Sequence, residues 1–186
     1  MRDVTCRHLP ALLITAGRST VAQMLTRLAQ SGGLNAALLI REGSGYSARG
    51  VDSGHTASAR GSLAEVLRII SEERGFDAII DPVGGACTPG PGGRLISYEL
   101  LADSEFLIKV SRLLSRNMIW QGFGTDRWLS HAPAELLKNA ESDLWNLFSE
   151  QPDLLPVIGG FPLSRIHEAI QSASAPQEPG KILLVS

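Results

Sequence analysis

The feature that most constrains the fold is the alternation, along the chain, of short apolar runs with segments of helical period. Residues 11–15 (ALLIT) and 35–40 (NAALLI) are apolar almost without a break, which is typical of strands buried on both faces of a parallel sheet. Gly32 and Gly33 favour the end of a helix between these strands. Apolar residues in that helix recur at steps of three and four, as on one helical face: Val21, Met24, Leu25 and Leu28.

The same alternation continues to the C-terminus. We predict further strands at residues 76–81, 94–101, 118–124 and 181–186, and further helices at residues 63–73, 104–117, 133–151 and 164–174. A chain of 186 residues is long enough to bury one sizeable core. The repeated β/α units predict an α/β fold with a Rossmann-like, doubly wound parallel sheet.

Residues 15–20 (TAGRST) connect the first predicted strand to the first predicted helix. In a doubly wound fold, small residues in this turn let backbone N–H groups at the helix N-terminus approach a pyrophosphate. Gly17, Ser19 and Thr20 are small, but the turn has one glycine where the dinucleotide fingerprint has three. The turn alone therefore leaves dinucleotide binding and an ordinary strand-to-helix connection as equal alternatives.

Arg41 stands at the carboxyl end of the second predicted strand, where this fold places the adenosine ribose of a dinucleotide. An acidic residue there selects NAD, whereas an arginine accommodates the 2′-phosphate of NADP. Glu42 follows directly and either pairs with Arg41 or contacts a ribose hydroxyl. Arg41 thus favours NADPH, with a solvated arginine at a strand end as the alternative.

Five segments, in order, resemble the cofactor-binding half of the medium-chain dehydrogenase/reductase superfamily. The resemblance spans nearly the whole chain, and it is closest to the zinc-free quinone oxidoreductases and the 2-enoyl thioester reductases. The segments that carry it are ITAGRSTVAQMLTRLAQSGGLNAALLIRE, GFDAIIDPVGG, GGRLISYELL, IWQGFGTDRWL and FPLSRIHEAIQSASAPQEPGKILLV.

The resemblance implies a zinc-independent reductase that transfers a hydride from NADPH, in which the bound cofactor carries the chemistry and the protein supplies position. It implies that the pyrophosphate lies over the first turn of the helix and the 2′-phosphate near the end of the second strand. The residues it assigns to these two groups are Gly17, Ser19, Thr20 and Val21 for the pyrophosphate, and Arg41 with Tyr46 for the 2′-phosphate.

Other assigned residues follow the later strands. In the family, the DPVGG turn borders a ribose of the cofactor, which assigns Val83 and Gly84 here. The family's cofactor residues after GGRL correspond to Tyr98 and Leu100 in this chain. The GF pair that lies beside the nicotinamide in the family corresponds to Gly122 and Phe123. The resemblance assigns no catalytic side chain to this chain.

The chain also departs from the family pattern. Family members begin with a GroES-like catalytic domain, whereas this chain starts almost at the first Rossmann strand, so we expect a Rossmann-like NADP-binding domain at 1–153 that works with a separate catalytic domain. Residues 154–186 match the segment that packs on the catalytic domain in relatives. Residues 43–50 (GSGYSARG) and 86–91 (ACTPGP) are short for the helices they replace, so we expect part of the sheet to be uncovered.

Few other residues suggest chemistry of their own. Four dispersed histidines and two cysteines, Cys6 and Cys87, lack the spacing of zinc ligands, and both thiols are expected to be free. Asp81 could act as a base, but an aspartate at the end of a strand more often caps a turn. Cys87 has no basic neighbour in sequence that would activate its thiol.

Charge and hydropathy exclude some partners. The formal net charge is −2 with scattered basic residues, so we expect no nucleic-acid binding, and no apolar run reaches the about 20 residues of a membrane span. We therefore expect a cytoplasmic protein. The strand near residues 118–123 matches the edge strand that, in the family, pairs across a two-fold axis, so the resemblance together with the apolar side chains predicts a homodimer through that strand.

Two functions remain at this stage. The first is an NADPH-dependent oxidoreductase, of quinone oxidoreductase or enoyl reductase type, that is inactive without its catalytic domain. The alternative is a non-catalytic relative that keeps the fold for dimerisation or nucleotide sensing, which the eroded glycine turn would permit. NADPH binding distinguishes the two functions.

Overall fold

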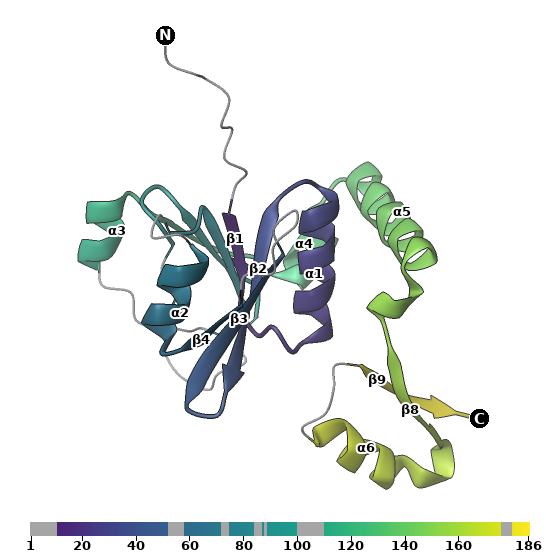
Figure 1. The fold of residues 1–186 in the computed structure, drawn as a ribbon. Helices are drawn as coiled ribbons and strands as arrows, with labels where there is room; N and C mark the ends of the chain where they lie inside the picture. Colours follow the sequence, from purple (N-terminus) through teal and green to yellow (C-terminus); the bar gives the residue numbers. More distant parts are fainter. Residues whose placement is uncertain are drawn as a thin grey trace.

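A computed structural model describes residues 11–51, 58–71, 75–83, 87, 89–99, 110–175 and 180–186. Its centre is a seven-stranded sheet of order β4-β3-β2-β1-β5-β6-β7 (Figure 1). The strands are β1 (Ala11–Ile14), β2 (Asn35–Glu42), β3 (Gly45–Val51), β4 (Ser58–Gly61), β5 (Ala78–Asp81), β6 (Arg94–Ser97) and β7 (Ile119–Gly122). Strands β2, β1, β5, β6 and β7 run parallel to one another, so the predicted fold class is confirmed.

Helices cover both faces of the sheet. The helices are α1 (Thr20–Ser31), α2 (Leu63–Ile70), α3 (Val110–Arg116), α4 (Thr125–His131), α5 (Ala134–Glu150) and α6 (Ile166–Ser174), with short 3₁₀ turns η1 (Pro152–Leu154) and η2 (Leu163–Arg165). One buried cluster lies beneath α1 and includes Leu12, Ile14 and Ala22. A second lies beneath α2 on the opposite face and includes Leu13, Val66 and Ile79 (Figure 1). Successive side chains of β1 therefore point into the two clusters in turn. This is why the strand is apolar at every position, as expected for a strand that is covered on both faces.

Helix α1 begins and ends where the sequence indicates. The Ser19 hydroxyl accepts a hydrogen bond from the Ala22 N–H at 3.0 Å and so caps the N-terminus. Gly32 caps the C-terminus, and Gly33 follows with φ of +75°, a backbone conformation that favours glycine. The predicted strand–helix–strand unit is therefore confirmed.

The Gly/Ser-rich stretch after β2 forms a strand in place of the helix that the family pattern has there. Strand β3 pairs antiparallel with both β2 and β4, so it is the one reversed strand of the sheet. Successive residues of β3 are buried on opposite faces of the sheet. Ala48 lies in the cluster beneath α2, and Ser47 is buried on the other face. The β2–β3 hairpin therefore extends the sheet at this position.

Two described residues of the connector between β5 and β6, Cys87 and Pro89, are buried. We expected part of the sheet to be uncovered. Ile119 and Trp120 of the edge strand β7 are exposed, whereas Ile79 of β5 and Leu95 of β6 are fully buried. Cys87 of the connector packs with both in the same cluster. Pro89 is likewise fully buried. The described part of the connector therefore contributes to the core.

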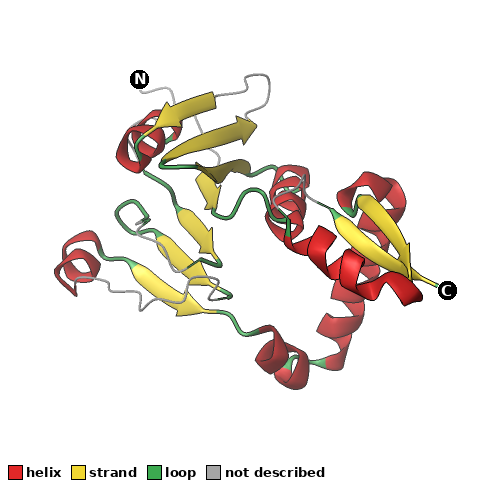
Figure 2. Ribbon diagram, turned by 90° about the horizontal axis from the view of Figure 1, so that it is seen from below, coloured by secondary structure: helices red, strands yellow, loops and turns green. Residues whose placement is uncertain are grey.

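The C-terminal residues form a second, smaller unit. Strands β8 (Val157–Pro162) and β9 (Lys181–Val185) pair in parallel, and α6 connects them. This pair stands apart from the seven-stranded sheet in both ribbon views (Figures 1 and 2). Its apolar side chains are largely exposed: Val157, Ile158, Leu183, Leu184 and Val185. The boundary predicted at residue 153 falls within η1, just before this unit.

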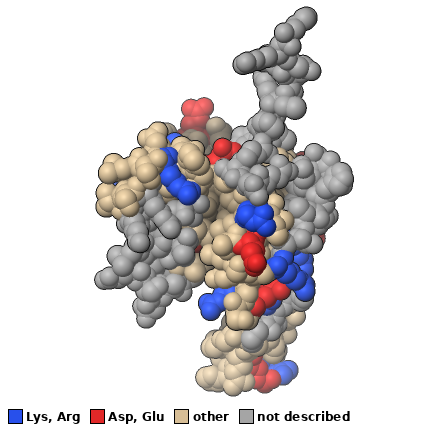
Figure 3. Space-filling model, turned by 60° about the vertical axis from the view of Figure 1, so that its left-hand side comes forward, with Lys and Arg blue, Asp and Glu red and all other residues tan. Residues whose placement is uncertain are grey.

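Charged side chains are interspersed on the surface. On the face in Figure 3, acidic and basic residues alternate and no broad patch of one sign forms. In the described part of the chain, we found no helix both long enough and apolar enough to cross a bilayer.

Candidate functional site

The predicted cofactor residues converge on one edge of the sheet, because the carboxyl ends of parallel strands lie together. Register pairs Asp81 with Ser97, and Ser97 with Gly122, so β5, β6 and β7 end side by side. The described candidates at or just beyond these carboxyl ends, and in the turn after β1, are Gly17, Ser19, Thr20, Val21, Arg41, Val83, Tyr98, Gly122 and Phe123. The other described candidate, Tyr46, joins this edge from β3, whereas Gly84 and Leu100 lie outside the described residues.

The turn between β1 and α1 needs its one glycine. A Cβ atom added to Gly17 would lie 2.8 Å from Ile40 Cγ1 and 3.0 Å from the Leu39 carbonyl oxygen of β2. The Gly17 N–H donates to that same carbonyl oxygen at 2.9 Å. The turn is therefore packed directly against the neighbouring strand, where a residue with a Cβ atom does not fit without a shift.

Two backbone donors at the start of α1 are open. The Ala22 N–H is used by the Ser19 cap, and the Gln23 N–H donates to the Ser19 carbonyl at 3.2 Å. Within the described residues, the N–H groups of Thr20 and Val21 have no hydrogen-bond acceptor. Unpaired N–H groups at a helix N-terminus, together with the helix dipole, favour an anion. The eroded turn thus retains the donors that a phosphate requires.

The end of β2 carries the predicted arginine together with a tyrosine. Arg41 is exposed and pairs directly with Tyr46 across the β2–β3 hairpin, so both side chains stand on one face of the sheet. Within the described residues, Glu42 does not form the ion pair with Arg41 that was one of the two roles considered from the sequence. Its carboxylate accepts the Ser47 hydroxyl at 2.9 Å and lies 3.8 Å from the guanidinium of Arg60. Arg41 is therefore not neutralised by its neighbour.

Asp81 is the most enclosed acidic group of the site, with 0% of its surface exposed. Its Oδ1 atom accepts the Val83 N–H at 3.0 Å, so the predicted turn-capping role is confirmed. The same oxygen accepts the Thr15 hydroxyl at 2.6 Å. This second contact joins residues that lie 66 positions apart, and no local sequence pattern indicates it.

Two further titratable groups lie near Asp81. Burial, and to a smaller extent the negative charge of Asp81, raises the pKa of the Cys87 thiol to about 12. The pKa of Tyr98 is also raised, first by burial and then by the charges of Glu99 and Asp81. Both groups therefore stay protonated at neutral pH. Cys87 is a free thiol, buried and unactivated, as its surroundings in sequence predict.

The last strand of the parallel set carries an aromatic pair at its end. The Phe123 N–H donates to the Ser97 carbonyl at 2.7 Å and extends the pairing of β7 with β6. The rings of Phe123 and Trp128 lie 6.3 Å apart at their centroids, which fixes the turn into α4. Gly122 has open space beside it, because no atom lies within 4 Å of an added Cβ.

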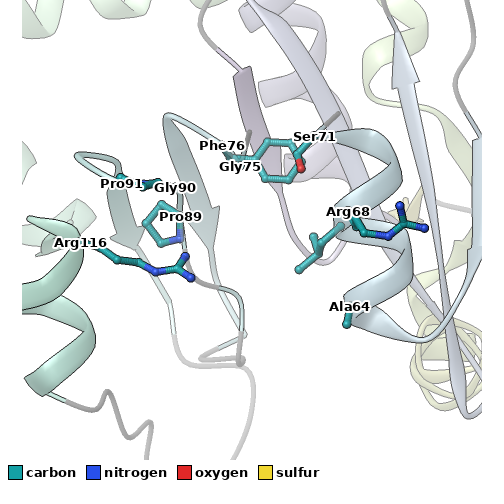
Figure 4. A pocket seen from close by; sticks show the side chains of 10 residues that line it. Ala64, Arg68, Ser71, Gly75, Phe76, Pro89, Gly90, Pro91 and Arg116 are labelled. Atoms are coloured by element: carbon teal, nitrogen blue, oxygen red, sulfur yellow. The ribbon is translucent and has the colours of Figure 1, made fainter. Parts of the chain in front are cut away.

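A groove of about 750 Å³ lies at the other end of the sheet. Its lining residues Phe76, Gly90 and Pro91 come just before β5 and β6, at the amino ends of these strands. Figure 4 shows Arg116 on one side of the groove and Arg68, with helix α2, on the other. This groove is therefore distinct from the edge that gathers the predicted cofactor residues.

Metal ligands do not gather in the described part of the chain, where no three His, Cys, Asp or Glu side chains come close enough to hold an ion. His131 contacts only its own helix, through the Arg127 carbonyl and the Ser130 hydroxyl.

Comparisons with known proteins were made by sequence and by structure. No protein-family model and no curated protein matches the sequence. Solved structures do match. A protein from Bacillus thuringiensis that carries the name NADPH:quinone reductase superposes with a TM-score of 0.71 at 17% identity, over 96% of this chain and 56% of its own.

Two other structures agree with that match. The quinone oxidoreductase of Pseudomonas syringae pv. tomato gives a TM-score of 0.65 at 13% identity, over 96% of this chain and 58% of its own. The CurK enoyl reductase gives 0.64 at 14% identity, over 96% and 56%. The chain spans about half the length of the structures it matches. The chain therefore shares its fold with the matched half of these reductase structures.

Proposed function

We propose that these residues form the NADPH-binding domain of a zinc-independent medium-chain reductase, of quinone oxidoreductase or enoyl thioester reductase type. The observation that carries the proposal is the turn at Gly17, where close packing on β2 leaves the N–H groups of Thr20 and Val21 open at the edge that gathers the other candidates. NADPH, when bound, supplies the hydride. The protein's own residues bind and orient the nucleotide.

The cofactor preference is assigned to Arg41. An exposed guanidinium at the carboxyl end of β2 suits the 2′-phosphate of NADPH, and the Tyr46 phenol stands beside it in register. Glu42, which could have favoured NADH through the ribose, is held by Ser47 and Arg60. This arrangement supports a preference for NADPH over NADH.

Catalysis is proposed to require a GroES-like catalytic domain beyond these residues, on the same or another polypeptide. Two exposed apolar surfaces support this requirement. One is the β8–α6–β9 unit, and the other is the outward face of α5, with Leu136, Leu144 and Trp145. An exposed apolar surface of this extent indicates a site that binds another protein or domain.

The first prediction tests the nucleotide site by isothermal titration of the chain with NADPH and with NADH. We expect NADPH to bind more tightly than NADH. Arg41→Ala should weaken NADPH at least tenfold, equivalent to about 1.4 kcal/mol, because the 2′-phosphate loses its charge partner. NADH affinity should stay within twofold, because NADH has no 2′-phosphate.

The matched control is Arg49→Ala. Arg49 is an exposed arginine on the adjoining strand, but it pairs with Leu38 and stands on the opposite face from Arg41. It should leave both affinities unchanged. Equal losses in the two variants would mean a general charge effect, and no binding of either nucleotide would favour the non-catalytic alternative, a dimerisation or sensing module.

The second prediction concerns the proposed homodimer through β7. This strand is at the edge of the described sheet and exposes Ile119 and Trp120, so it suits edge-to-edge pairing with a second copy. Ile119→Lys should shift the chain from dimer to monomer in light scattering at micromolar concentration. Ile69→Lys is the control, because Ile69 is equally exposed at 48% but lies on α2. A monomeric wild-type protein would rule out this interface.

A further inference from the structure

The strand order of the sheet reverses between β1 and β5. From β1 the chain proceeds to β2, β3 and β4 on one side, and it then returns to β5 on the other. In open α/β sheets, ligands bind at such a switch point, in the crevice outside the carboxyl ends of the strands. Thr15 follows β1 and Asp81 ends β5, so the two residues face each other directly across this point.

A short hydrogen bond joins Thr15 and Asp81 at this switch point. The Thr15 Oγ1 atom donates to Asp81 Oδ1 at 2.6 Å, within the range of bonds to an ionised acceptor. Both side chains are buried, with 5% of Thr15 and none of Asp81 exposed. A buried contact of this kind is little screened by water and specifies one geometry.

The bond ties together the two turns that border the proposed nucleotide site. On one side is the turn at Gly17, and on the other is the turn that Asp81 caps through the Val83 N–H. The backbone makes a parallel connection, because the Thr15 N–H donates to the Ile80 carbonyl at 3.0 Å. The hydrogen bond from the Thr15 hydroxyl to Asp81 extends the connection between the strands one residue beyond the end of β1.

The first turn needs such an anchor. Thr15 links the start of this turn to β5, because its hydroxyl reaches Asp81. Ala16 follows with φ of +54°, a left-handed conformation that is strained for a residue with a Cβ atom. Ala16 is held between Thr15, bonded to β5, and Gly17, bonded to the Leu39 carbonyl of β2.

We infer that Thr15 and Asp81 are a positioning pair for the nucleotide. Their hydrogen bond fixes the separation of the turn at Gly17 from the Asp81–Val83 turn. This inference rests on the proposed function. It adds that affinity for the nucleotide depends on two buried residues that act through the backbone turns they hold.

The test compares three variants by NADPH titration and thermal unfolding. Thr15→Val removes the hydroxyl with little change of shape, and it should weaken NADPH about tenfold. Thr15→Ser keeps the hydroxyl and should restore the affinity to within twofold of wild type. Thr26→Val is the matched control: Thr26 is also 5% exposed, and its hydroxyl donates to the Ala22 carbonyl within α1 at 2.8 Å.

A purely structural role predicts that both valine variants lower the unfolding temperature and neither changes affinity. The positioning role predicts similar unfolding temperatures for the two, with affinity lost only in Thr15→Val. If Thr15→Val does not fold, Asp81→Asn decides, because it keeps the size of the side chain but removes the charge from the acceptor. It should weaken NADPH about threefold.

The outcomes separate the two proposals. Wild-type affinity in Thr15→Val, or in Asp81→Asn where Thr15→Val does not fold, overturns the positioning pair and leaves the proposed function intact. A wild-type chain that binds no NADPH overturns the proposed function, and the pair with it. Affinity lost equally in Thr15→Val and Thr26→Val shows a general loss of stability and also overturns the pair.

Discussion

Replacing Gly17 with alanine is expected to lower the free energy of unfolding by about 2 kcal/mol, within the usual cost of overpacking a well-packed site. The added Cβ atom would lie 2.8 Å from Ile40 Cγ1 and 3.0 Å from the Leu39 carbonyl oxygen. A carbonyl of a central strand cannot rotate away as a flexible side chain can. The turn must therefore shift, and NADPH binding should weaken with it.

Urea unfolding of Gly17→Ala beside Gly160→Ala measures this effect. An added Cβ at Gly160 of β8 meets nothing within 4 Å, so that variant should change the free energy of unfolding by less than about 0.5 kcal/mol. Equal losses in the two variants would contradict the close approach of the turn to β2.

Replacing Ile79 with alanine should have a still larger effect on stability. Ile79 lies on the central strand β5, is 0% exposed and packs with Leu13, Val66 and Leu95. Removing its outer carbons leaves a cavity between strands and α2 that the surrounding side chains fill only in part. We expect a loss of about 3 kcal/mol and a fall in the unfolding temperature of about 10 °C.

Ile69→Ala is the comparison. The same side chain is 48% exposed on α2, so its truncation should cost less than about 1 kcal/mol. Calorimetry on both variants tests the burial of the β5 face. A loss at Ile79 no greater than the loss at Ile69 would mean that the described connector does not cover this part of the sheet.

Local pattern was sufficient for the regular β/α units. Continuous apolar runs predicted β1, β2 and β5, because a strand covered on both faces has no polar side to alternate with. The small residues after β1 and the glycines at 32 and 33 predicted where α1 begins and ends. Arg41 was placed correctly at a strand end for the same reason, since its position depends only on the length of β2.

The hairpin after β2 could not be assigned in this way. Residues 43–50 contain three glycines and two serines, and their composition indicates a loop as readily as a strand. The backbone of β3 is ordered by pairing with β2 on one side and β4 on the other. Its strand character therefore depends on neighbours from outside the segment. The burial of the β5–β6 connector similarly depends on contacts with Ile79 and Leu95.

The sequence by itself determined the fold class, the boundaries of α1 and the positions of Gly17 and Arg41, because these follow from periodicity and from residues adjacent in the chain. Only the tertiary structure decided that Glu42 interacts with Ser47 and Arg60, and that Thr15 meets Asp81. The last contact joins residues 66 positions apart, and it exists because parallel strands β1 and β5 end at the same level. No pattern within either segment encodes the level at which another strand will stop.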